Sequence, residues 1–261
     1  MVKKYFRLMI LHFSLILVVL LPDSIALNND SSLKLYLAFD EENGKIAKDH
    51  SKSQLEGRLS GKAKFVKNGR FGGALSLEDS NSLVQLPATD ELNITKSITI
   101  AAWIFPLVNQ KDSNVIGRRT AANVGGYCIQ WSGLGAVAKV ETWIGLPVWQ
   151  GTRNLQKTEP KLEKWHHVVA IYDGNEIKQY VNGKLDAYLK IPDREIASQK
   201  VELHIGKAQT GLPGIVGKID EVAIYDRALT KDEIKSDMQK GVFFSVEPSE
   251  KLATKWATLK R

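Results

Sequence analysis

The chain has 261 residues, with 36 Lys and Arg against 29 Asp and Glu, and its formal net charge is +7. The basic excess is spread along the chain, and no basic run alternates with aromatic residues, so the composition predicts no nucleic-acid partner. The single cysteine, Cys128, excludes an internal disulfide, and the surrounding run GGYCIQW predicts that it packs as a small buried side chain.

The first 26 residues have the pattern of a secretory signal peptide. Basic residues precede an apolar run from Leu8 to Leu21, and Ser24-Ile25-Ala26 supplies the small residues of a cleavage site. The apolar run is shorter than the roughly 20 residues that a spanning helix needs, although an uncleaved anchor is the alternative. We therefore expect a secreted, extracellular protein (or a periplasmic or cell-surface one), with no membrane attachment after cleavage and a polar linker over residues 27–32.

Short strands separated by turn signals follow from residue 33 onward. The first, 33–39, alternates apolar and polar residues. The glycine-rich segment 68–73 lacks the Lys-Ser/Thr ending of a phosphate loop and predicts a turn. Further strands are expected at 55–66, 74–77, 82–86, 97–105, 115–117, 127–131 and 137–144, and after a loop over 145–160 at 165–172, 177–181, 201–205 and 219–225.

Two local signals are specific enough to fix a turn and a helix. Asn182-Gly183 is typical of a type I′ hairpin turn, because both residues tolerate the left-handed conformation. Thr230 with Glu233 three residues later predicts a capping box for a helix over 231–240, which Gly241 ends. The sequence thus predicts an all-β protein, a two-sheet antiparallel β-sandwich or jelly roll with one short C-terminal helix, followed by a basic tail over 241–261.

Five segments, taken in order, resemble a known family. They are YLAFDEENG, RFGGALSL, SITIAAWIFP, WHHVVAIYDGNEIKQYVNGKLD and GKIDEVAIYDRALTKDEI. Over residues 33–240 the chain is similar to the laminin-G-like jelly-roll domain of the concanavalin A-like lectin/glucanase superfamily. The resemblance implies an extracellular binding module, often for carbohydrate and often with calcium, although some relatives are glycoside hydrolases.

Catalysis is not supported by the spacing of the acidic residues. Glycoside hydrolysis usually needs two carboxylates on one face, and the Glu-x-Asp-x-x-Glu signature of the superfamily's glucanases is absent. The neighbours Asp220 and Glu221 point to opposite faces of a strand, and so do His166 and His167.

We expect a non-catalytic glycan-binding module. A structural or adhesive module that binds a cell-surface protein is the second hypothesis, and a glycoside hydrolase or polysaccharide lyase with acids from separate strands is the third.

The resemblance places the first and last strands side by side, which brings Asp40 close to Asp220. Two neighbouring carboxylates repel unless a cation or a proton intervenes, so Asp40 and Asp220, with Asp49 as a third ligand, are the predicted Ca²⁺ site. The alternative is that these carboxylates accept hydrogen bonds from backbone amides and turns.

Sugar rings stack on exposed aromatic faces, and three tryptophans are candidates for that role. Trp103 and Trp165 lie in apolar strands and are expected in the core. The predicted ligand-binding residues, led by the loop residue Trp149, are Trp149, Trp143, Trp131, Arg153 and Asn154. A core or loop-anchoring role for each tryptophan is the alternative.

Overall fold

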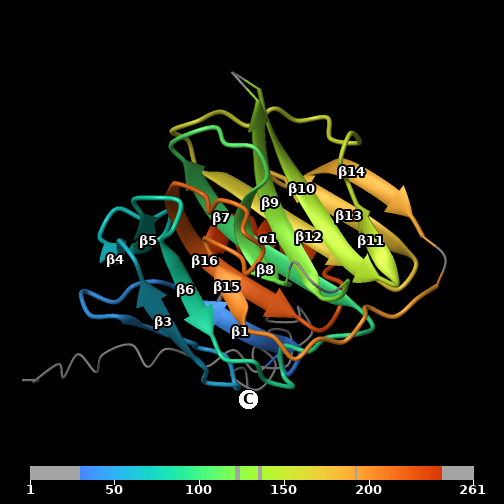
Figure 1. Cartoon of the computed structure of the whole chain (residues 1–261), viewed down its shortest axis with the longest axis horizontal. Coiled ribbons are helices and arrows are strands. Elements are labelled where there is room, and N and C mark those ends of the chain that lie inside the picture. The colour runs from blue at the N-terminus through green and yellow to red at the C-terminus, as the bar shows by residue number, and fades with distance from the viewer. Residues whose placement is uncertain (1–29, 121–123, 135–136, 192, 243–261) are drawn as a thin grey trace, which may run out of the picture.

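Two antiparallel β-sheets lie face to face in the computed structural model, which describes residues 30–120, 124–134, 137–191 and 193–242 (Figure 1). This confirms the predicted sandwich. The predicted signal peptide and all but the first two residues of the basic tail lie outside the described residues. No helix within the described ranges is long and apolar enough to cross a membrane.

The first sheet, called sheet A here, has the order β14-β13-β12-β7-β16-β5-β4, with β1 also paired to β16. Its strands are β1 (Leu33–Leu37), β4 (Ala63–Val66), β5 (Ala74–Leu77), β7 (Ile98–Pro106), β12 (His166–Tyr172), β13 (Glu176–Val181), β14 (Lys184–Lys190) and β16 (Gly217–Tyr225). The second, sheet B, has the order β11-β10-β9-β8-β15-β6-β3-β2. Its strands are β2 (Ile46–Lys48), β3 (Glu56–Ser60), β6 (Leu83–Leu86), β8 (Ser113–Arg118), β9 (Tyr127–Leu134), β10 (Val137–Leu146), β11 (Val148–Gly151) and β15 (Leu203–Ile205).

The local signals of the sequence are confirmed. Asn182 (φ 51°) and Gly183 (φ 74°) form the tight turn between β13 and β14, and both have the left-handed backbone that this turn requires. The helix α1 spans Lys231–Lys240, and Thr230 and Glu233 close the capping box. Gly241 ends the helix at φ 78°. The first and last strands pair antiparallel, with Leu37 opposite Val222.

The outer faces of the two sheets differ. The main apolar core fills the space between the sheets, as the alternation of apolar residues on each strand predicts. A second apolar cluster covers part of the outer face of sheet A, where Tyr36 and Tyr225 pack with Ile234 of α1. On the outer face of sheet B, β10 presents Lys139, Glu141 and Trp143, while its alternate residues enter the core. The candidate ligand-binding site lies on this polar outer face of sheet B.

Two expectations, about a loop and about a buried tryptophan, need correction. The predicted loop over 145–160 contains the end of β10 and the whole of β11. In this hairpin Trp149 lies opposite Gly145, and Trp143 lies opposite Gly151, so each large ring has a glycine beside it. Trp165 is only half-buried, packed against Phe105, since it precedes β12 instead of lying within it. His166 and His167 do point to opposite faces, but both are buried, because tryptophans cover each side.

Candidate ligand-binding site

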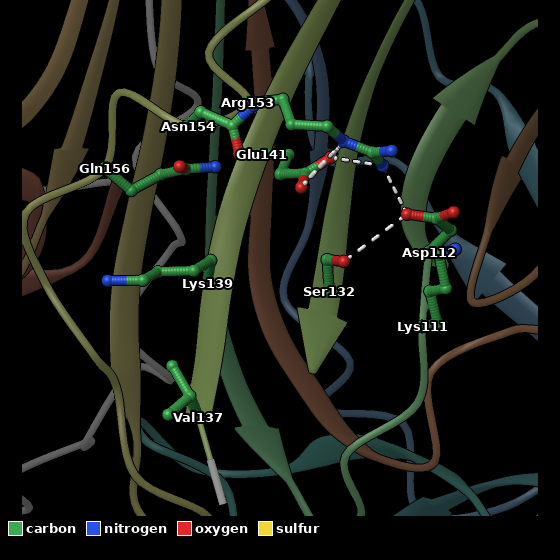
Figure 2. Close-up of a pocket in the computed structure, with 9 residues that line it drawn as sticks. All are labelled: Lys111, Asp112, Ser132, Val137, Lys139, Glu141, Arg153, Asn154 and Gln156. Carbon is green, nitrogen blue, oxygen red and sulfur yellow. Dashed lines mark hydrogen bonds and ion pairs between the residues drawn. The ribbon is translucent and has the colours of Figure 1, made fainter. Parts of the chain in front are cut away.

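A pocket of about 390 Å³ lies on the outer face of sheet B. Strands β9 and β10 form its floor, the segment after β11 forms one wall, and the segment before β8 forms the other (Figure 2). Its lining is polar apart from Val137: Lys111, Asp112, Ser132, Val137, Lys139, Glu141, Arg153, Asn154 and Gln156.

Glu141 is the buried anchor of this pocket. Its residue exposure is only 4%, so its charge must be compensated inside the protein. Arg153 donates to both carboxylate oxygens, from Nε at 3.1 and 3.0 Å and from Nη2 at 2.8 Å. Trp143 Nε1 donates a further bond of 3.0 Å. These bonds raise the pKa of the Arg153 guanidinium and hold the pair in one geometry.

Arg153 also reaches the opposite wall. Its Nη2 donates to Asp112 Oδ1, which accepts a second bond of 3.3 Å from Ser132 Oγ. One guanidinium therefore binds two carboxylates from different parts of the sheet, Glu141 on β10 and Asp112 on the segment before β8. Asp112 has a left-handed backbone (φ 55°), which aspartate tolerates better than most residues.

The structure separates the five predicted ligand residues. Arg153 and Asn154 line the pocket, whereas Trp143 supports it from the side: its ring contacts Gly151 and lies 5.2 Å from the Arg153 guanidinium carbon. Trp149 is half-buried beneath Arg119, whose guanidinium carbon is 4.5 Å from the ring centroid, and does not line the pocket. Trp131 is fully buried and donates to Asn109, so the expectation of a ligand role for it is corrected: it is a core residue.

The remaining lining residues were not predicted as ligands. The alternation along β10 could have placed Val137, Lys139 and Glu141 together on one face, because residues two apart in a strand share a side. Asp112 and Gln156 carry no such signal. They reach the pocket only because the sheet order places their segments on its two walls.

The three predicted metal ligands are used mainly as amide acceptors. Asp49 accepts four bonds, from Tyr36 N, Ser51 N, Ser51 Oγ and Leu55 N, which fills its acceptor positions. Among the described residues, no three His, Cys, Asp or Glu side chains come together as a metal site. The predicted set of three ligands is therefore not assembled, because Asp49 serves the turn that follows it.

Asp40 and Asp220 do meet at one place, the glycine-rich turn 68–73. Asp220 accepts from the backbone of Arg70 at 2.7 Å and Phe71 at 3.0 Å, and Asp40 accepts from Gly73 at 2.6 Å. Burial of Asp220, with Glu221 beside it, raises the pKa of its carboxyl group to about 8. The approach of these two carboxylates agrees with the expected pairing of the first and last strands.

The fold and the site define a jelly-roll domain that carries a polar pocket on the outer face of sheet B. The model described as the concanavalin A-like lectin/glucanases superfamily matches residues 78–235, and the chain belongs to this family. No curated protein matches the sequence significantly.

Solved structures share this fold at low sequence identity. One is domain 4 of AbnA, a GH43 extracellular arabinanase from Geobacillus stearothermophilus, in complex with arabinotriose. It is 20% identical in sequence and has a TM-score of 0.65. The match covers 80% of this chain and 98% of that domain. The binding domain of Paraclostridial Mosquitocidal Protein 1 is 16% identical, with a TM-score of 0.61 over 79% of this chain and 52% of that one.

A third is the binding domain of botulinum neurotoxin DC in complex with SialylT, which is 17% identical with a TM-score of 0.59 over 81% of this chain and 51% of that one. The chain thus spans about half the length of the toxin domains it matches. At these identities the likeness establishes the fold alone.

Proposed function

We propose that the protein is an exported, non-catalytic module that binds carbohydrate in the pocket on the outer face of sheet B. One observation carries the proposal: a pocket of about 390 Å³ in which Arg153, Glu141 and Asp112 already hold one another in place. Groups held in place before binding lose little conformational freedom when a ligand arrives, which favours affinity.

The chemistry of the lining suits hydroxyl groups. Lys139 and Arg153 are hydrogen-bond donors, Asp112 is an acceptor, and Asn154 and Gln156 supply both kinds of group. A sugar hydroxyl both donates and accepts, so alternating partners of this kind can satisfy several hydroxyls at once. Two of the similar structures have a glycan named in their complexes, arabinotriose and SialylT, which supports the ligand class.

The arrangement of the two carboxylates argues against hydrolysis. A glycosidase needs one carboxyl group that carries a proton at working pH and can donate it to the leaving group. Here Glu141 and Asp112 both accept from the same guanidinium nitrogen of Arg153, so both carboxylates are engaged in one ion-pair network instead of facing a leaving group. Neither group is placed to act as a general acid.

A glycan array with four proteins tests the binding proposal. We expect the wild type and the distant control Lys62→Ala, a residue with a 69% exposed side chain, to give the same signals. The double variant Asn154→Ala/Gln156→Ala should weaken the best signal at least about tenfold, which is about 1.4 kcal/mol. Loss of binding with Trp149→Ala but not with the double variant would move the site to the predicted aromatic residue.

The other functional hypotheses are outcomes of the same experiments. The binding domain of botulinum neurotoxin DC is also described in complex with rat synaptotagmin II, so the fold is compatible with a protein ligand. An absence of glycan signal for all four proteins would favour a protein partner. Release of reducing ends from a polysaccharide panel would support a hydrolase or lyase and reject the non-catalytic proposal.

Export and calcium binding are secondary parts of the proposal. Export rests on the leader pattern of residues 1–26, and N-terminal sequencing of the protein secreted by its host would test cleavage after Ala26. Calcium would lie between Asp40 and Asp220 at the turn 68–73, where a cation would compensate the buried carboxylate. Backbone carbonyls or water would have to complete its six to eight oxygen ligands.

A further inference from the structure

The side chain of Arg153 crosses the floor of the pocket from one wall to the other. Arg153 follows β11, and its partner Asp112 immediately precedes β8. Since the sheet order is β11-β10-β9-β8, the Arg153–Asp112 ion pair passes over both β10 and β9 (Figure 2). Val137 and Lys139 lie further along β10, on one side of this crossing.

This crossing is fixed by two further residues. Glu141 holds it from below through three bonds to Arg153, and Ser132 holds Asp112 from β9. The side chain of Glu141 is 5% exposed and that of Asp112 is 19% exposed. Breaking their ion pairs with Arg153 would therefore leave carboxylates without a partner in a partly desolvated site, which is costly. We therefore treat the crossing, which we call the Arg153–Asp112 bar, as a permanent wall of the pocket.

We propose that the pocket binds the terminal residue of a glycan chain, and that the Arg153–Asp112 bar excludes internal segments. The inference rests on carbohydrate being the ligand. A chain that enters along Val137 and Lys139 meets the bar and cannot continue across the sheet. The volume of about 390 Å³ is also near the lower end of the about 300–1,000 Å³ typical of small-molecule sites, which suits a short piece of chain.

The bar also supplies the chemistry that recognises a chain end. Arg153, with a 38% exposed side chain, presents a donor beside the acceptor Asp112. Two neighbouring hydroxyls of a terminal sugar can bond both groups at once. In an internal residue, one hydroxyl near the linkage is replaced by the glycosidic bond, so such a pair is less often available.

The test measures affinity by calorimetry for oligosaccharides of two to six residues, built from the sugar that gives the best array signal. We expect the dissociation constant to change less than about threefold along this series. O-methylation of the hydroxyls on the terminal residue should weaken binding at least about tenfold. Methylation is applied separately to each end of the chain, so the sensitive end is also identified.

Opening the bar provides a second arm. Asp112→Gly suits the left-handed backbone at this position, and it removes one end of the bar while Arg153 and Glu141 stay paired. This variant should recover binding of end-methylated chains, whereas Lys62→Ala should not. Circular dichroism checks the fold, and the wild-type length series stands alone if the variant does not fold.

Two results overturn the inference, and they are distinguishable. If glycans bind but affinity rises steadily with each added residue and ignores end methylation, the site accepts internal segments and only the end-recognition proposal fails. If no oligosaccharide binds at any length, the carbohydrate function itself is rejected, and end recognition falls with it.

Discussion

Removal of Arg153 should expose the dependence of the pocket on one buried charge. In Arg153→Ala, Glu141 would keep the bond from Trp143 Nε1 but lose its three bonds from the guanidinium. Loss of one partner of a fully buried ion pair costs about 3–5 kcal/mol. The Arg153 side chain is 38% exposed, so water can reach Glu141 after truncation, and we expect a smaller loss of about 2–3 kcal/mol. The midpoint of thermal unfolding should fall by about 4–12 °C, at about 2–4 °C per kcal/mol for a domain of this size.

The second substitution in the cycle separates charge from packing. Glu141→Gln removes the buried charge and keeps the shape, so the double variant Arg153→Ala/Glu141→Gln should regain at least about 1 kcal/mol over Arg153→Ala. Urea unfolding followed by tryptophan fluorescence measures each free energy. A matched control is Arg70→Ala. The side chain of this arginine also stacks on a tryptophan, with its guanidinium carbon 4.4 Å from the Trp103 ring, but no bond from that side chain to a carboxylate is found among the described residues.

We expect Arg70→Ala to cost at most about 1 kcal/mol, the scale of an exposed cation–π contact. If Arg153→Ala costs no more than this control, or if Glu141→Gln restores nothing, then Glu141 is not a buried charge that depends on Arg153. In that case the pocket is not fixed before binding, and the main support for the proposed function is lost.

Further predictions concern titration, calcium, the hairpin and the helix. Burial lowers the pKa of His167 to about 3, so below about pH 6.5 the unfolded chain binds a proton that the folded chain does not. The free energy of unfolding should therefore decrease as the pH drops from about 6.5 toward 3. His167→Gln should reduce this dependence on pH. For Asp220 the pH dependence of stability has the opposite sign, because its pKa is raised to about 8 and the folded state binds the extra proton. The free energy of unfolding should decrease as the pH rises from about 4 to 8, and Asp220→Asn should reduce that decrease. Calcium needs the ionised carboxylate, so it should raise the unfolding midpoint more at pH 8 than at pH 5, and equal midpoints with calcium and with a chelator at both values would reject the metal. Gly183→Ala should cost about 1 kcal/mol because φ is 74°, and Thr230→Ala should cost a similar amount through the lost cap, both measured by urea unfolding; an unchanged stability would contradict either local assignment.

Elements that depend on local signals could be predicted from the sequence. Alternating apolar residues placed most strands, Asn182-Gly183 placed a hairpin, and Thr230 with Glu233 placed the helix, since each signal acts within a few residues. The family resemblance added the pairing of the first and last strands, which brought Asp40 and Asp220 to one turn.

Which side chains meet in the pocket could not be predicted, because it depends on the order of the strands in the folded sheet. Asp112 and Arg153 are 41 residues apart, and they touch because β8 and β11 flank the same two strands of sheet B. The order of strands within a sheet depends on long-range pairing, which leaves no periodic trace in the sequence. The same limit applies to the tryptophans. Trp131 and Trp143 both lie in strands, but Trp131 points into the core, whereas Trp143 lies on the outer face beside the pocket.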